Sequence, residues 1–137
     1  MDETLLHYDI DQQKQEGFYL IRPFCEIFLR ELSQYWEIVI FTASVSEYAN
    51  WLIDDMDTEN VIDFRLYRQH TTLNSDGITT KDLSLLGRPL SKTIIVDNTE
   101  TCFLLTQPNN GIGIETWTSD MKDRALEILM PFLLEIA

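Results

Sequence analysis

The sequence predicts an α/β fold, arranged as a three-layer sandwich with a mostly parallel central sheet. Two observations support this prediction. Amphipathic helical segments alternate with short apolar runs along the chain, which is the order that builds a parallel sheet covered by helices on both faces. The apolar runs also lack polar alternation, as expected for strands that are buried on both sides.

The first half of the chain contains a loop, two helices and a strand in the predicted order. Residues 8–18 are polar and predict an exposed loop. A proline in the first turn and apolar residues at helical spacing predict a helix over 23–35. The run 37–41 predicts a buried strand. Ser44 or Ser46 can cap the following helix, and Ser44 with Glu47 also forms a capping-box pattern. The apolar stripe of this helix consists of Val45, Ala49, Leu52, Ile53 and Met56.

The second half begins with a change of pattern. Residues 61–80 break into short pieces around a Ser-Asp-Gly turn, which predicts a small β insert. The run 92–97 predicts a second buried strand, followed by a short helix over 99–105 and a third strand over 111–116. We expect Asp120 to cap the last helix. Its inner face is expected to consist of Ala125, Ile128, Leu129, Phe132, Leu133 and Ile136.

The composition indicates one acidic globular domain. The chain has 137 residues with no repeat or linker, so we expect residues 1–137 to form a single domain. The formal net charge of −13 argues against direct binding to nucleic acid. No apolar run approaches the roughly 20 residues of a membrane span. The two cysteines lack metal-binding or redox spacing, which predicts buried free thiols in a reducing compartment. We expect a nuclear or cytoplasmic location rather than a mitochondrial one, since no targeting presequence is visible.

Polar residues follow the ends of two predicted strands. Thr42 follows the strand over 37–41, and Asp97 and Asn98 close the strand over 92–97. The carboxyl ends of parallel strands share one edge of a sheet, where ligands bind in open α/β folds. Each of these residues also has an ordinary explanation as a helix cap or a turn residue. Their order along the chain, together with Asp2, Thr4 and Lys81, is what indicates a functional site.

That order resembles the haloacid-dehalogenase superfamily of phosphotransferases. Within it, the chain resembles the small phosphatases that act on the C-terminal repeat domain of RNA polymerase II, together with the Dullard-type and NLI-interacting-factor-like phosphatases. The resemblance spans the whole chain and implies a haloacid-dehalogenase-like Rossmannoid fold without a large cap domain. The matching stretches are DETLLH (2–7), RPFCEIFL (22–29), IVIFTAS (38–44), RLYRQH (65–70), the highly specific KDLSLLGRPLSKTIIVDN (81–98) and DMKDRALEILMPFL (120–133).

The resemblance implies a Mg²⁺-dependent protein serine/threonine phosphatase that works through an aspartyl-phosphate. Asp2 matches the acid/base aspartate, whose backbone carbonyl would also contact the metal. Thr4 matches the threonine that supports this loop. Thr42 would donate a hydrogen bond to a phosphoryl oxygen, and Lys81 would pair with the phosphate and the nucleophile. These residue types suit phosphoryl transfer, which needs proton transfer and cations against the phosphoryl oxygens.

Metal and substrate residues are implied in the same way. Asn98 matches a side-chain ligand of Mg²⁺, and Asp97 beside it would orient Lys81 or the metal's waters. Arg68 resembles the arginine that points at the phosphopeptide, and it would supply a local cation in an acidic protein. Arg22 is also a family signature, which we interpret as structural. The implied partner is a phosphoserine or phosphothreonine protein, such as the RNA polymerase II C-terminal repeat, and no direct nucleic-acid or membrane contact is expected.

The resemblance also implies that the chain begins inside its own catalytic loop. In the family pattern the nucleophilic aspartate stands two positions before Asp2, upstream of Met1. It ends a strand that lies between the strands ending at Phe41 and Val96. We therefore expect the first core strand to be missing and residues 1–137 alone to be inactive. Unpaired backbone groups at the centre of a sheet cost about 1–3 kcal/mol each when buried, so the isolated chain is also expected to be unstable.

Two other functions fit parts of the pattern. The family includes the import-receptor subunit of the mitochondrial inner-membrane translocase, which is a binding module. The short segment between His7 and Arg22 favours that function, whereas the intact polar set at the strand ends argues against it. A small-molecule phosphatase or mutase of the wider superfamily would carry a capping domain, and the insert at 61–80 is too short for one.

Overall fold

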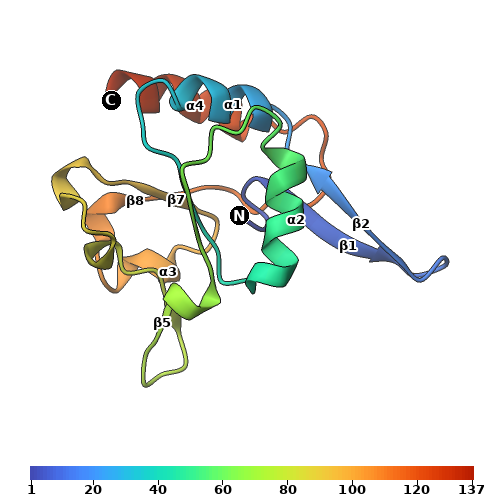
Figure 1. Cartoon of the computed structure of the whole chain (residues 1–137), viewed down its shortest axis with the longest axis horizontal. Coiled ribbons are helices and arrows are strands. Elements are labelled where there is room, and N and C mark those ends of the chain that lie inside the picture. Colours follow the sequence, from blue (N-terminus) through green and yellow to red (C-terminus); the bar gives the residue numbers. More distant parts are fainter.

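The computed structural model describes all 137 residues and has an α/β order of elements (Figure 1). The α-helices are α1 (Cys25–Leu32), α2 (Ser46–Met56), α3 (Thr101–Leu104) and α4 (Ala125–Glu135). The strands are β1 (Leu6–Asp11), β2 (Glu16–Ile21), β3 (Val39–Phe41), β4 (Phe64–Leu66), β5 (Thr72–Leu73), β6 (Thr79–Thr80), β7 (Ile95–Asp97) and β8 (Gly111–Gly113). None of the helices combines the length and the apolar content needed to cross a membrane.

The core strands form two separate parallel pairs. β3 pairs with β4, with Val39 opposite Phe64. β7 pairs with β8, with Ile95 opposite Gly111. No strand pairing joins β3 to β7. The predicted α/β class and the parallel direction of the core strands are confirmed. The sheet is divided between β3 and β7, which is where the resemblance implied a missing core strand.

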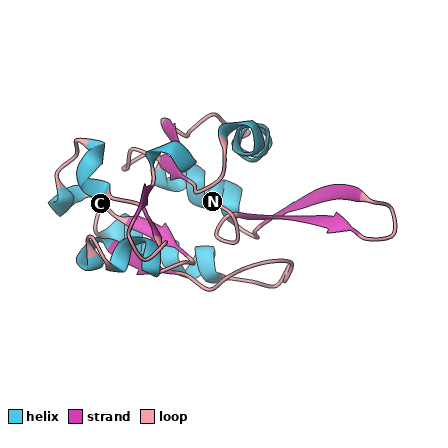
Figure 2. Cartoon of the chain, turned by 90° about the horizontal axis from the view of Figure 1, so that it is seen from below, coloured by secondary structure: helices cyan, strands magenta, loops and turns pink.

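The segment predicted as an exposed loop over 8–18 is instead most of a β-hairpin, so that prediction was wrong. β1 and β2 pair antiparallel and project away from the body of the molecule (Figure 2). Aromatic contacts anchor the hairpin to α2. The ring centroid of Trp51 on α2 lies 5.5 Å from that of Tyr19 and 6.3 Å from that of Tyr8. The polar residues that suggested a loop lie toward the hairpin tip, and the anchoring partner is far away in sequence.

The segment 61–80 contributes to the core as well as to a small hairpin. Residues 64–66 form β4, which pairs directly with β3. Only β5 and β6 form the antiparallel hairpin, with Gly77 in its turn at φ 78°, a backbone conformation that glycine adopts readily. The elements between β3 and β7 are therefore α2, β4, this hairpin and short 3₁₀ turns, without a large cap.

The hydrophobic core is divided like the sheet. The larger cluster joins α1, α2, β3 and α4 to the N-terminal residues Met1, Leu5 and Leu6. The stripe predicted for α2 is buried from Ala49 onward, whereas Val45 is exposed and precedes the helix. A smaller cluster of Leu83, Ile95, Cys102 and Phe103 holds β7 against α3.

The last helix differs from its prediction in start and in orientation. α4 begins at Ala125, whose N–H donates to Asp123 at 3.1 Å, so Asp120 does not cap it. Its fully buried residues are Leu126 and Leu133, whereas the following residues of the predicted inner face are exposed: Ile128, Phe132 and Ile136. The helix is apolar on nearly every side, so its sequence alone did not reveal which stripe faces α1. Figure 1 shows α1 and α4 side by side.

Candidate active site

The carboxylate of Asp2 is held by hydroxyl groups that follow β3. Thr42 Oγ1 lies 3.3 Å and Ser44 Oγ lies 3.1 Å from Asp2 Oδ2, and both hydroxyls donate. The hydroxyl of Tyr48 donates to Asp2 Oδ1 at 3.0 Å. Thr42 is 1% exposed. Asp2 is therefore fixed against the carboxyl end of β3, where the sequence placed Thr42.

Two of the partners of Asp2, Ser44 and Tyr48, were not predicted from the sequence. Ser44 matched a capping box, but α2 begins after Val45 without a side-chain cap, and the Ser44 hydroxyl reaches Asp2 instead. Burial raises the pKa of Tyr48, and the negative charge of Asp2 and its hydrogen bond raise it further. No local signal identified either residue, because Ser44 precedes the helix and Tyr48 lies in its first turn.

Thr4 joins the N-terminal loop to the end of β7. Its hydroxyl donates to Asn98 Oδ1 at 3.1 Å and accepts from the Asn98 N–H at 3.3 Å. The Asn98 amide nitrogen donates in turn to Thr116 Oγ1 at 3.1 Å. Asp2 and Thr4 together link the loop 1–4 to the carboxyl ends of β3 and β7.

Arg22 supports the loop 1–4 through buried hydrogen bonds. Its guanidinium donates to the Thr4 carbonyl at 3.1 Å and to both carboxylate oxygens of Asp123, at 2.8 and 3.0 Å. The Arg22 side chain is fully buried. These hydrogen bonds match the structural role that the sequence suggested for Arg22, since its side chain bonds to the Thr4 backbone and to Asp123 and not to Asp2.

Lys81 and Asp97 form a buried ion pair at the end of β7. Lys81 Nζ lies 2.5 Å from Asp97 Oδ2, and the other carboxylate oxygen accepts from the Thr99 N–H at 2.9 Å. Burial alone would raise the pKa of Asp97, but the charge and the hydrogen bond of Lys81 hold it below its usual value. The Lys81 carbonyl accepts a hydrogen bond from Gln107, which fixes the lysine backbone.

The amino group of Met1 lies among these charges. Burial lowers its pKa, and the positive charge of Lys81 lowers it further, while the negative charges of Asp97, Asp2 and Glu3 act in the opposite direction. Met1 is 6% exposed. The first backbone nitrogen of the chain is therefore enclosed at the edge where the polar residues of β3 and β7 meet.

Arg68 lies beside the segment that follows β3, on the outside. Its Nε donates to the Ala43 carbonyl at 2.8 Å, and its backbone N–H donates to the Ser44 carbonyl at 3.0 Å. Its side chain is exposed. The structure thus brings Arg68 to the loop that carries Thr42, while its hydrogen bonds are with that loop and with Thr71 rather than with Asp2 or Lys81.

The oxygen atoms that could act as metal ligands at this edge suit Mg²⁺. Asp97 and Asn98 are consecutive at the end of β7, and the hydrogen bond from Thr4 connects Asn98 to the loop of Asp2. No three His, Cys, Asp or Glu side chains converge tightly enough to hold a metal by themselves. A metal here would depend on the Asn98 amide oxygen, a main-chain carbonyl and water, which fits Mg²⁺ because this ion usually keeps several waters.

Comparison with known proteins gives close sequence relatives. The family model described as NLI interacting factor-like phosphatase matches residues 1–137. A probable C-terminal domain small phosphatase of Dictyostelium discoideum is 40% identical over 97% of this chain and 47% of the relative. The carboxy-terminal domain RNA polymerase II polypeptide A small phosphatase 2 of Homo sapiens is 33% identical over the whole chain and 55% of the relative. The chain thus spans about half the length of these relatives.

Solved structures agree with the observed arrangement of elements. The structure of Fcp1, described as an essential RNA polymerase II CTD phosphatase, matches 99% of this chain and 47% of that protein with a TM-score of 0.68. A beryllium fluoride-bound fission yeast Fcp1 variant matches with a TM-score of 0.69. The identities of 17% and 16% support the fold alone.

Proposed function

Because the chain belongs to the NLI interacting factor-like phosphatase family, we propose that it forms the catalytic domain of a Mg²⁺-dependent protein serine/threonine phosphatase. Phosphatase function at the level of the family and the resemblance indicated by the motifs are both confirmed by these relatives. Nothing among the relatives named above supports the import-receptor alternative.

One observation supports this proposal more than any other. The N-terminal loop bonds to both core strands at their carboxyl ends, through Asp2 to Thr42 and through Thr4 to Asn98. Lys81 and Asp97 lie at the same end of β7. An acid, a cation, hydroxyl donors and amide oxygen at one sheet edge are the groups that phosphoryl transfer requires.

In the proposed first step, a carboxylate of the residue two positions before Asp2 attacks phosphorus and forms an acyl-phosphate. The bond from phosphorus to the serine or threonine oxygen breaks, and Asp2 gives its proton to that leaving oxygen. Residues i and i+2 at a strand end point the same way, so both acids face one substrate. The three hydroxyl donors around Asp2 keep its carboxylate in one position.

In the second step, Asp2 accepts a proton from a water molecule, which attacks the acyl-phosphate. The phosphorus–carboxylate bond breaks, and phosphate and the free carboxylate are released. Thr42 and Lys81 would donate to the phosphoryl oxygens in both steps. Mg²⁺, held by Asn98, the Asp2 carbonyl and Asp97 directly or through water, would offset the negative charge on those oxygens.

The proposed substrate is a phosphoserine or phosphothreonine segment of another protein, with the RNA polymerase II C-terminal repeat as a candidate. The site has no large cap, so an extended peptide could reach it. Arg68 is exposed beside the loop of Thr42 and Ser44, where its guanidinium would meet a phosphate or an acidic flanking residue.

The test compares residues 1–137 with a chain extended by an apolar strand that ends in aspartate two positions before Asp2. We expect the extended chain to release phosphate from a phosphoserine peptide only with Mg²⁺, and the chain of 137 residues to release none. Replacing the added aspartate by asparagine is the matched control. Equal turnover by the control, or turnover by residues 1–137 alone, would contradict the proposed mechanism.

A further inference from the structure

The 3₁₀ turn η1 (Arg68–His70) lies directly beside the segment that positions Asp2. The Arg68 N–H donates to the Ser44 carbonyl at 3.0 Å, and the Ser44 hydroxyl donates to Asp2 Oδ2 at 3.1 Å. Ser44 therefore contacts both the turn and the acid of the candidate site. Tyr67, which precedes the turn, donates its hydroxyl to an asparagine of α2, so the turn is held on two sides.

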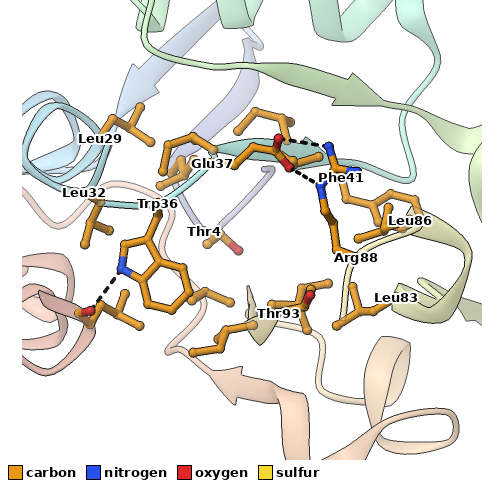
Figure 3. Close-up of a pocket in the computed structure, with 18 of the residues that line it drawn as sticks. Thr4, Leu29, Leu32, Trp36, Glu37, Phe41, Leu83, Leu86, Arg88 and Thr93 are labelled. Carbon is orange, nitrogen blue, oxygen red and sulfur yellow. Dashed lines mark hydrogen bonds and ion pairs between the residues drawn. The ribbon is translucent and has the colours of Figure 1, made fainter. Parts of the chain in front are cut away.

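The turn η1 belongs to a stretch of the chain that lacks negative charge. Residues 64–75 contain no aspartate or glutamate, although the whole chain has 23. Arg68 is the only arginine without a carboxylate within ion-pair distance. The others form pairs, as Arg88 does with Glu37 at 2.9 and 3.0 Å (Figure 3). An exposed and unpaired arginine in so acidic a chain keeps its charge available for a bound anion.

The ring of His70 has one nitrogen in use and one free. Its Nδ1 accepts a hydrogen bond from the Tyr67 N–H at 2.9 Å. In the neutral ring the accepting nitrogen carries no proton, so the proton lies on Nε2. Nε2 makes no hydrogen bond within the chain, and the residue is exposed. His70 is therefore a hydrogen-bond donor that is held in one tautomer and is accessible to a ligand.

The other histidine of the chain has acidic neighbours instead. His7 Nδ1 lies 3.1 Å from Glu3 Oε1, and His7 Nε2 lies 3.9 Å from Asp9 Oδ2. Both ring nitrogens of His7 therefore face carboxylates of the chain itself. His70 has no carboxylate within ion-pair distance, so an anion that approaches it meets no negative charge in contact with the ring.

We propose that His70 is a specificity-determining residue for substrates that carry a second anionic group, a carboxylate or a second phosphate, close to the phosphorylated serine or threonine. The Nε2–H of His70 would donate to an oxygen of that group, and Arg68 on the same turn would add positive charge. The inference rests on the proposed phosphatase function, because it requires the phosphorylated residue to lie at Asp2. It names the class of substrate: a phosphopeptide that is acidic beside the site of reaction.

The spacing between the two anionic groups follows from the position of η1. Only Ser44 separates the Asp2 carboxylate from the Arg68 backbone, with a hydrogen bond to each. An extended peptide advances about 3.3 Å per residue, and every second side chain points the same way. A group two residues from the phosphoserine, roughly 7 Å along the peptide, would therefore face the same surface of the protein as the phosphate.

Two substitutions separate a binding role of His70 from a structural role. In His70→Asn, the amide oxygen lies as many bonds from Cα as Nδ1 does, so it can still accept from the Tyr67 N–H, whereas the Nε2 donor is lost. In His70→Gln, the amide nitrogen takes the place of Nε2 and the acceptor for the Tyr67 N–H is lost. Gln69→Ala, on the same exposed turn, is the matched control.

The experiment measures binding of three labelled peptides to residues 1–137 and these variants by fluorescence anisotropy. Each peptide has a central phosphoserine, and the second residue on either side is phosphoserine, glutamate or glutamine. We expect His70→Asn to bind the phosphoserine-flanked and glutamate-flanked peptides about tenfold more weakly and the glutamine-flanked peptide unchanged. His70→Gln should retain most of the affinity and have a lower thermal midpoint. In the aspartate-extended chain, His70→Asn should raise KM for the two anionic peptides and leave kcat unchanged.

Two results would overturn this role of His70. One is equal binding of all three peptides by His70→Asn and the parent chain. The other is an equal loss with the glutamine-flanked peptide, because His70 would then act on the structure or on the central phosphate. A loss confined to the phosphoserine-flanked peptide would support the proposal and identify the second group as phosphate. If the aspartate-extended chain released phosphate from none of the peptides, the proposed function would fail, while the binding comparison would still decide the role of His70.

Discussion

Lys81 Nζ lies 2.5 Å from Asp97 Oδ2, and both side chains are less than a tenth exposed. Removing one partner of such a pair leaves a buried charge without compensation, which costs about 3–5 kcal/mol. We expect Lys81→Met and Asp97→Asn each to lower the free energy of unfolding by this order. The double variant should lose much less than the sum of the two single variants. Urea unfolding of the four chains measures this coupling, and simple additivity would contradict it.

A second prediction concerns the pair that supports the Thr4 loop. Arg22 is fully buried and bonds to both oxygens of Asp123, so Asp123→Asn should destabilise the chain by about 3–5 kcal/mol. The matched control is Glu127→Gln on the same segment, which breaks the exposed Arg124–Glu127 pair. Exposed pairs contribute little, and we expect the urea midpoint of the control to stay unchanged. Similar losses in both variants would contradict the role assigned to Arg22.

The Arg22–Asp123 pair also predicts how the free energy of unfolding falls at acid pH. Hydrogen bonding to Arg22 lowers the pKa of Asp123 from its usual value of 3.8. A carboxyl group with a lower pKa in the folded state stabilises fully above its unfolded pKa, and this contribution is lost as the pH falls through the folded pKa. We expect the free energy of unfolding, measured between pH 6 and pH 3, to fall less steeply in Asp123→Asn. Parallel curves for the two chains would show that Asp123 does not contribute.

The thiols provide a test of the two hydrophobic clusters. Burial raises the pKa of Cys25 and of Cys102 to about 12, and for Cys102 the negative charge of Asp97 adds to the effect. Thiol reagents attack through the thiolate, so at pH 8 both cysteines should react far more slowly in the folded chain than in denaturant. Rapid labelling of the folded chain at Cys102 would show that the cluster around β7 is open.

The local sequence predicted the fold class because each core element carries its own periodicity. The run at 37–41 and the stripe of α2 are apolar enough to identify β3 and α2 without knowledge of their neighbours. The hairpin of β1 and β2 was missed because its anchor, Trp51, lies on another element. The inner face of α4 was predicted only in part: Leu133 is buried as expected, whereas Leu126 was missed. Apolar residues surround this helix, so tertiary packing and not the local pattern selects the buried stripe.

In the candidate site, too, local patterns were predictable and contacts between distant segments were not. Thr42, Asp97 and Asn98 could be predicted because parallel strands bring their carboxyl ends to one edge. The contacts of Ser44 with Asp2 could not, since a serine before a helix is usually a cap. The roles of Asp2, Thr4, Thr42, Lys81, Arg68, Asp97 and Asn98 in catalysis, substrate binding and metal binding stay predictions.

The final prediction concerns Tyr48, whose hydroxyl donates to Asp2 Oδ1 at 3.0 Å. A hydrogen bond to a charged group is worth about 1.5–3 kcal/mol, so Tyr48→Phe in the aspartate-extended chain should lower kcat roughly tenfold or more, because Asp2 loses a donor that orients it. The control is Tyr8→Phe, which keeps the ring whose centroid lies 5.6 Å from that of Tyr48 and leaves Asp2 untouched. Phosphate release from a phosphoserine peptide and the thermal midpoint are measured on both variants. An equal kcat for Tyr48→Phe and Tyr8→Phe, with unchanged midpoints, would contradict the assignment of Tyr48 as a positioning residue for Asp2.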